Sequence, residues 1–188
     1  SSSNPCVRND PAATPRPLTR EALPAAVHVL SARDPAMAWL ADRHGIPPLW
    51  EREPGFATLL LIILEQQVSL ASARATYDRL LARTGIPTPD ALLALGAGAL
   101  RSIGFSRQKA EYARDLARAV IDGEFDCAAL ESMPDETART MLMARRGIGA
   151  WSADVYLLMA LRRPDVWPAG DLALQVAAQD VKGLAERP

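Results

Sequence analysis

Signals that start and stop helices alternate along almost the whole of this chain. Asp34-Pro35 sets a capping side chain directly before a proline, which suits the first turn of a helix. Ser106 precedes an amphipathic pattern in the same way, and Gly45 and Gly123 follow where such patterns end. We therefore expect short helices over 24–32, 35–44, 56–67, 70–84, 89–99, 107–122, 135–146 and 150–161, and a last one starting near 171.

The stretch 56–67 decides between fold classes, because it is apolar nearly all round. Periodicity alone cannot classify such a run, but its length and leucine content favour a buried helix over a strand. No other segment alternates apolar and polar residues as a half-buried strand would. The sequence therefore predicts an all-α fold of about nine or ten short helices.

Composition limits what kind of protein this can be. Hydrophobic residues make up 49% of the 188 residues and charged residues 23%, a balance typical of one folded globule. The apolar run from Ala57 to Leu64 is far shorter than the roughly 20 residues of a membrane span, so we expect no membrane partner. The proline- and serine-rich segment 1–17 shows no periodicity and is predicted to be a flexible tail.

Few residues are available to bind a metal. The chain has two cysteines, Cys6 and Cys127, and two histidines, His28 and His44. These cannot supply a four-cysteine zinc site or an iron–sulfur cluster, so we expect no metal and no cofactor. Free cysteines also fit a reducing compartment, and we expect a cytoplasmic protein.

The segment LMARRGIGAWSA at 142–153 has the pattern of two helices joined by a tight turn. Gly147 and Gly149 permit unusual backbone conformations, and the next helix begins at Ala150 with unpaired backbone amides. Such a helix start can bind a phosphate through its backbone alone. A glycine cap between two packed helices explains an isolated Gly-x-Gly equally well, and Asp171, which opens a later helix, is by itself an ordinary capping residue.

Taken together, these motifs resemble the helix–hairpin–helix DNA glycosylases, in particular the bacterial 3-methyladenine DNA glycosylase II type. The resemblance spans about residues 24–181, and its motifs are EQQVS at 65–69, GIGAWSA at 147–153 and WPAGD at 167–171. It implies two helical lobes with a DNA-binding cleft between them. Residues 55–133 would form a central lobe. Residues 18–54 would pack with 134–188, which would contain the hairpin and the aspartate.

The resemblance implies a role for several residues. Asp171 takes the place of the family's catalytic aspartate, which stabilises positive charge on the sugar or orients the attacking water. Trp151 stands where strand-nicking members carry a lysine, which implies a monofunctional enzyme whose tryptophan stacks on an alkylated base. Tyr156, further along the same helix, is a second candidate for the base pocket, and a core position is the alternative for both aromatic residues.

Further positions imply contacts with DNA. Gly147, Gly149 and Ala150 would bind a phosphate, and Gln67 matches a position that inserts a polar side chain where a base has left the duplex. The turn 104–107 resembles the loop that wedges into DNA, with Phe105 or Arg107 as the wedge. Although the net charge is only −1, local cations could still bind DNA. The expected cations are Arg101, Arg107, Lys109, Arg145, Arg146, Arg162 and Arg163.

The resemblance thus implies a monofunctional glycosylase that releases alkylated purines such as 3-methyladenine from damaged double-stranded DNA. We expect a monomer, associated with the nucleoid of a bacterial cytoplasm. Related chains continue into further helices beyond the point that matches Pro188, so this chain is expected to be a short form or to lack a C-terminal segment. A non-catalytic binder of damaged DNA, a glycosylase for other damaged bases and a helical scaffold remain alternatives.

Overall fold

The computed structural model describes residues 14–188, and within this range every regular element is a helix. The first half contains α1 (Leu23–Arg33), α2 (Pro35–His44), α3 (Phe56–Glu65), α4 (Leu70–Thr84) and α5 (Pro89–Ser102). The second half contains α6 (Arg107–Ile121), the 3₁₀ turn η1 (Ala129–Ser132), α7 (Asp135–Met143), α8 (Ala150–Met159) and α9 (Leu172–Lys182). The all-α prediction is confirmed.

The predicted helix starts are largely confirmed, because the capping residues act as expected. The side chains of Asp34, Ser69, Thr88 and Ser106 each accept a hydrogen bond from a backbone amide in the first turn that follows. Such a bond satisfies one of the amides that a helix start leaves unpaired. Local side-chain chemistry therefore sets where these helices begin.

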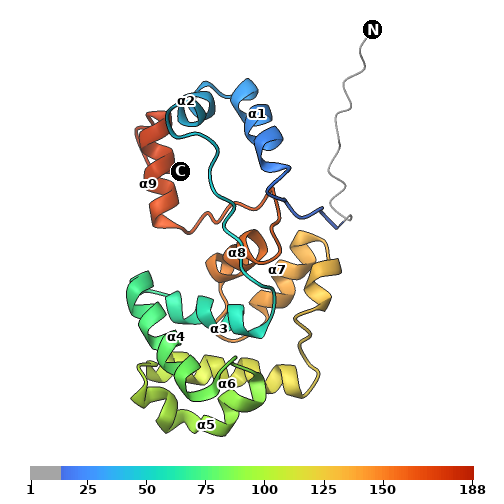
Figure 1. Cartoon of the computed structure of the whole chain (residues 1–188), viewed down its shortest axis with the longest axis vertical. Coiled ribbons are helices and arrows are strands. Elements are labelled where there is room, and N and C mark those ends of the chain that lie inside the picture. Colours follow the sequence, from blue (N-terminus) through green and yellow to red (C-terminus); the bar gives the residue numbers. More distant parts are fainter. Residues whose placement is uncertain (1–13) are drawn as a thin grey trace.

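Helix α3 is the centre of the fold. Seven of its ten residues are buried, and it packs against α4, α6 and α8 (Figure 1). The helix ends at Glu65, two residues earlier than predicted, because the backbone of Gln66 is extended and Gln67 has φ 55°. This early end puts the two glutamines into a turn.

Two other boundaries also differ from the prediction. Helix α7 ends at Met143 rather than continuing to residue 146, and the chain tightens into a turn in which the amide of Ile148 donates to the carbonyl of Arg145 at 3.1 Å. Helix α5 continues to Ser102, beyond its predicted end at residue 99, and breaks once at Gly96, where φ is 72°.

The N-terminal and C-terminal parts of the chain meet at one end of the molecule, where α1, α2 and α9 lie (Figure 1). Lys182 of α9 pairs with Asp34, and the amide of Leu18 donates to the carbonyl of Arg162 at 2.8 Å. None of these three helices contains a buried residue. The core lies instead among the helices α3 to α8.

Most of the predicted flexible tail, 1–13 of 1–17, lies outside the described residues. The remaining part, 14–17, is held on the fold. The Thr14 hydroxyl donates to the carbonyl of Ser132 at 2.6 Å, and the carbonyl of Pro15 accepts from Arg163 at 2.5 Å. These two contacts join the start of the described chain to η1 and to the segment that follows α8.

Candidate functional site

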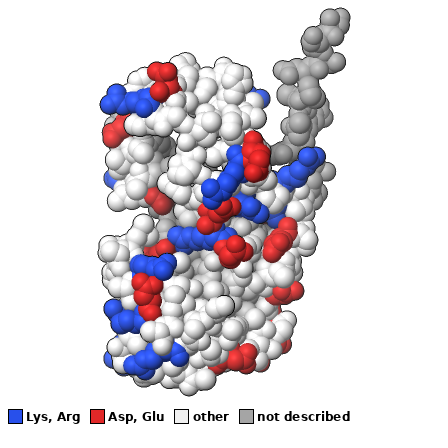
Figure 2. Space-filling model, viewed as in Figure 1, with Lys and Arg blue, Asp and Glu red and all other residues white. Residues whose placement is uncertain are grey.

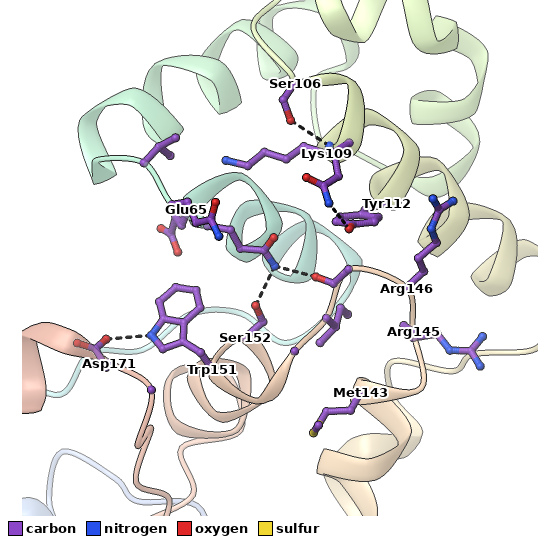
Figure 3. A pocket seen from close by; sticks show the side chains of 18 of the residues that line it. Glu65, Ser106, Lys109, Tyr112, Met143, Arg145, Arg146, Trp151, Ser152 and Asp171 are labelled. Atoms are coloured by element: carbon purple, nitrogen blue, oxygen red, sulfur yellow. Dashed lines mark hydrogen bonds between the residues drawn. The ribbon is translucent and has the colours of Figure 1, made fainter. Parts of the chain in front are cut away.

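An open groove of about 1160 Å³ runs between the end of α3, the start of α6, the turn before α8 and the start of α9 (Figure 3). Three of the motifs singled out in the sequence meet in it. The groove is lined by residues 65–68 at the end of α3, by Ser106, Gln108, Lys109 and Tyr112 at the start of α6, by 145–149, Trp151 and Ser152 of the hairpin, and by 170–173 at the start of α9. Segments distant in the sequence thus form one concave surface.

The hairpin between α7 and α8 presents the N-terminus of α8 to this groove. Gly147 has φ +84°, which L-residues with side chains rarely adopt, and Gly149 is the N-cap of α8 without any side-chain cap. The first amides of α8 therefore have no side-chain partner at the cap, and they carry the positive end of the helix dipole. This arrangement suits an anion such as a phosphate.

The glutamine that positions the hairpin was not singled out from the sequence. The side-chain amide of Gln66 donates to the carbonyl of Gly147 at 2.7 Å and to the hydroxyl of Ser152 at 2.9 Å. Ser152 itself is buried in α8. These two bonds tie the end of α3 to both sides of the turn, and only the tertiary structure reveals them.

Asp171 stands at the edge of the groove as the N-cap of α9. Its Oδ1 accepts from the amide of Leu174 at 3.0 Å, and its Oδ2 accepts from the indole Nε1 of Trp151 at 3.0 Å (Figure 3). The hydrogen bond from Trp151 and the backbone bonds of the cap hold the pKa of Asp171 below its usual value. A carboxylate that stays charged can stabilise positive charge developing in the groove.

Other charged groups in the groove already have partners. The ammonium of Lys109 donates to the carbonyl of Leu64 at 2.7 Å, and burial lowers its pKa. Glu65 is bound at two points by Arg52, at 2.9 and 3.0 Å. Both interactions join separate segments of the fold. The main role of the Lys109 ammonium and the Glu65 carboxylate is therefore to fix the end of α3.

Two residues predicted at the site are placed in the core instead. Tyr156 is fully buried, and its hydroxyl accepts from the amide of Gly55 at 2.9 Å, so it does not line the groove. Phe105 is 4% exposed because the chain turns inward at Gly104, where φ is 110°. The expectation that Phe105 points outward as a wedge therefore does not match this structure.

Gln67 and Arg107 are both exposed, as inserted residues need to be. Gln67 lines the groove in a left-handed backbone conformation, two residues after the end of α3. Arg107 opens α6, and its guanidinium lies 3.3 Å from Glu111. Of the two wedge candidates named from the sequence, Arg107 is the exposed one.

The cations expected to bind DNA are mostly engaged within the protein. Arg163 is 1% exposed and donates to the carbonyls of Glu131 and Met133 at 2.9 and 3.1 Å, so it is a structural residue. Arg146 lies 3.3 Å from Glu111 and 3.1 Å from Asp115. On the face shown in Figure 2, basic and acidic side chains are interspersed and no basic patch forms. The expectation of a group of free local cations is wrong for Arg163.

Comparison with known proteins identifies the family of this chain. Residues 60–188 match the model of the HhH-GPD superfamily of base excision DNA repair proteins. This chain belongs to the HhH-GPD superfamily. The match covers α4–α9 and most of α3, and so it contains the whole of the groove described above.

Solved structures of the superfamily share this fold. A DNA-3-methyladenine glycosidase from Bacillus halodurans superimposes with a TM-score of 0.75 at 32% identity, over 85% of this chain and 75% of that one. The Schizosaccharomyces pombe 3-methyladenine DNA glycosylase Mag1, solved with abasic DNA, superimposes with a TM-score of 0.79 at 26% identity, over 87% of this chain and 83% of that one.

Curated relatives are similar over a shorter share of their length. The Bacillus subtilis protein YfjP is 28% identical over 161 residues, which are 81% of this chain and 56% of YfjP. DNA-3-methyladenine glycosylase 1 of Schizosaccharomyces pombe is 28% identical over 129 residues, which are 66% of this chain and 57% of the relative. The chain thus spans a little more than half the length of these relatives.

Residues 14–188 contain neither a candidate metal site nor a helix that could span a membrane. No three His, Cys, Asp or Glu side chains in this range lie together in a way that could hold a metal ion. No helix in the same range is both long enough and apolar enough to cross a membrane.

Proposed function

We propose that this chain is a monofunctional DNA glycosylase that hydrolyses the N-glycosidic bond of alkylated purines, of the 3-methyladenine type, during base excision repair. The observation that carries the proposal is the carboxylate of Asp171, held charged at the edge of a groove beside an uncapped helix start. Two relatives whose names include 3-methyladenine glycosylase activity, from Bacillus halodurans and Schizosaccharomyces pombe, support the substrate class.

Asp171 has only to stabilise positive charge on the sugar, because the base is a good leaving group. An alkylated purine is already cationic, so when the bond between C1′ and the base nitrogen breaks, the electron pair leaves with the base as a neutral molecule. Positive charge then develops on the sugar, where a fixed carboxylate stabilises it. Water bonds to C1′ and releases a proton to solvent, which leaves the free base and an abasic sugar.

A lowered pKa makes Asp171 a weak base, and its two oxygens already accept hydrogen bonds. We therefore assign it electrostatic stabilisation rather than removal of a proton from water. No second carboxylic acid is required to protonate the leaving group, because that group departs neutral. Bases that are not alkylated, which need such help, should be poor substrates.

DNA would be held mainly through backbone groups. The amides at the start of α8, after Gly147 and Gly149, would bind one phosphate, while the exposed Gln67 would enter the space left by a flipped base. Arg107 would contact the strand beside it. Because few cations are free, non-specific affinity should be modest and should fall as salt rises.

The decisive experiment compares wild type with Asp171→Asn for release of methylated bases from DNA treated with a methylating agent. Asparagine keeps the capping bond but lacks the charge. We expect wild type to release the base and the variant to lose nearly all activity. Full activity in the variant would remove the proposed role of Asp171. Saturable binding to abasic DNA without base release by wild type would identify a non-catalytic binder instead.

A panel of duplexes with single lesions defines the substrate and the reaction type. Each product is scored with and without alkali, because a glycosylase without lyase activity leaves an intact strand at the abasic site. We expect alkylated purines to be released and strands to break only after alkali, since Trp151 has no amine to form a Schiff base. Sedimentation with and without DNA tests the accompanying proposal that the protein acts as a monomer.

A further inference from the structure

The geometry around Asp171 joins the starts of two helices. Trp151 is the second residue of α8, and Asp171 is the N-cap of α9. The indole of Trp151 stands between the carboxylate and the end of α3, with its Nε1 edge directed at Oδ2 (Figure 3). The other oxygen, Oδ1, is held by the amide of Leu174. The carboxylate is thus fixed by the indole at Oδ2 and by the backbone amides of the α9 cap.

No other side chain of residues 14–188 donates a hydrogen bond to Asp171. Its neighbours on the groove are Gly170, Leu172 and Ala173, none of which has a polar side chain. If the indole donor is removed, Oδ2 is left to solvent alone. The backbone cap holds Oδ1, so among side chains only Trp151 orients the carboxylate in this part of the chain.

We propose that Trp151 is a positioning residue that holds the Asp171 carboxylate through its indole N–H while its ring forms the wall of the groove. The inference rests on the proposed function and extends it, because one side chain then couples the fit of the base to the orientation of the charge. A bound base that shifts the ring also shifts the N–H donor. A poorly fitting base is therefore discriminated against in the rate of bond breaking as well as in affinity.

Trp151→Phe tests this coupling, because phenylalanine keeps an aromatic face but lacks the donor. A hydrogen bond to a charged group typically contributes enough that its loss lowers a rate about 10- to 100-fold. We expect a loss of that size in the single-turnover rate of base release, with affinity for abasic DNA close to that of wild type. Trp39→Phe, on the exposed face of α2 away from the groove, is the matched control.

The hydrogen bond itself is measured without activity. The four tryptophans give four indole N–H signals in a ¹H–¹⁵N spectrum, and Trp151→Phe identifies the one of interest. We expect that signal to shift with pH as the Asp171 carboxyl is protonated, below the usual range for an aspartate. The titration should disappear in Asp171→Asn, whose amide does not ionise.

The outcomes separate the positioning role from the proposed function. If Trp151→Phe releases base at the wild-type rate while Asp171→Asn is inactive, the positioning role is overturned and the function stands. If Asp171→Asn is fully active, the catalytic role proposed for Asp171 fails, and the positioning role with it, whatever the indole signal does. An indole signal of Trp151 that is the same in wild type and Asp171→Asn at every pH would also overturn the positioning role. Thermal unfolding close to wild type shows that the variants are folded.

Discussion

Gly147 lies so close to Tyr112 that a Cβ atom at Gly147 would stand 2.2 Å from the Cγ and Cδ2 atoms of the tyrosine ring. The ring belongs to α6, and the glycine belongs to the turn before α8, so this contact sets how near the hairpin lies to the opposite wall of the groove. The guanidinium of Arg146 lies 5.6 Å from the centre of the same ring. A side chain at Gly147 would push the hairpin away from α6.

Gly147→Ala should therefore lower the free energy of unfolding by roughly 2–4 kcal/mol, from the cost of a positive φ and of overpacking combined. Gly149→Ala is the matched control, because φ is −91° there and no atom lies within 4 Å of the added Cβ. Urea denaturation measures both. Equal destabilisation by the two variants would contradict the explanation. If Gly149→Ala alone weakens DNA binding without loss of stability, the phosphate approaches that residue.

Removing the Gln66 side chain should loosen the hairpin. Gln66→Ala leaves the part-buried carbonyl of Gly147 and the hydroxyl of Ser152 without this donor, which should cost about 1–3 kcal/mol of stability. Gln66→Glu has nearly the same shape but presents acceptors to the carbonyl of Gly147, and so it should be at least as destabilised at neutral pH. Hydrogen exchange of the amides in 147–152 would locate the effect; protection unchanged from wild type would show that Gln66 does not position the turn.

Gln67 allows backbone strain to be separated from a contact with DNA. Its φ of 55° costs a non-glycine residue about 1 kcal/mol, which Gln67→Gly should recover as added stability. The same variant should bind abasic DNA more weakly, because it has lost the side chain. Gln67→Ala keeps the strain and loses the side chain, so it should share only the weaker binding. Wild-type affinity in both variants would exclude Gln67 from the DNA contact.

Substitution of Arg163 should affect the stability of the fold, whereas substitution of Arg107 should affect DNA binding. Arg163→Met removes the donor to several buried carbonyls and breaks the ion pair with Asp135, so it should cost roughly 3–5 kcal/mol of stability. Arg107→Ala should leave stability nearly unchanged. It should instead reduce the slope of log affinity against log salt by about 1, as expected for one lost phosphate contact. A reduced slope for a folded Arg163 variant would contradict the structural role assigned here.

The stabilising effect of Asp171 should depend on pH in a definite direction. Because its pKa is lower in the folded protein than in the unfolded chain, its charge contributes stability above the unfolded value, about 3.9, and that stability is lost as pH falls through the folded pKa. Asp171→Ala also loses the cap, which costs about 1 kcal/mol at neutral pH. The gap in unfolding free energy between wild type and Asp171→Ala should narrow in acid. A gap that widens in acid would contradict the lowered pKa.

The boundaries of many helices could be predicted from the sequence because they depend on local chemistry. Asp34, Ser69 and Ser106 cap the amides that follow them, and the apolar run around Leu60 forms a helix that is buried on nearly every side. The hairpin glycines and Asp171 were recognisable for the same reason. Each belongs to a short motif whose backbone requirements are contained in its own residues.

The functions of other residues could not be predicted, because they depend on contacts between distant segments. Phe105 and Tyr156 looked like candidates for DNA and base contacts, but packing buries both of them. Arg163 looked like a free cation, yet its guanidinium binds carbonyls within η1 and directly after it. A sequence pattern records the type of a residue and its spacing but not which side chains meet it in the folded protein.

The sequence by itself thus determined the helical class, the caps and the presence of an aspartate at a helix start after a glycine hairpin. Only the tertiary structure decided that Trp151 donates to Asp171, that Gln66 binds the hairpin and that Tyr112 limits residue 147 to glycine. The two groups of features differ in how far apart along the chain the interacting residues lie. A cap joins neighbours along the chain, whereas these three contacts join helices whose relative position is set by burying α3 among them.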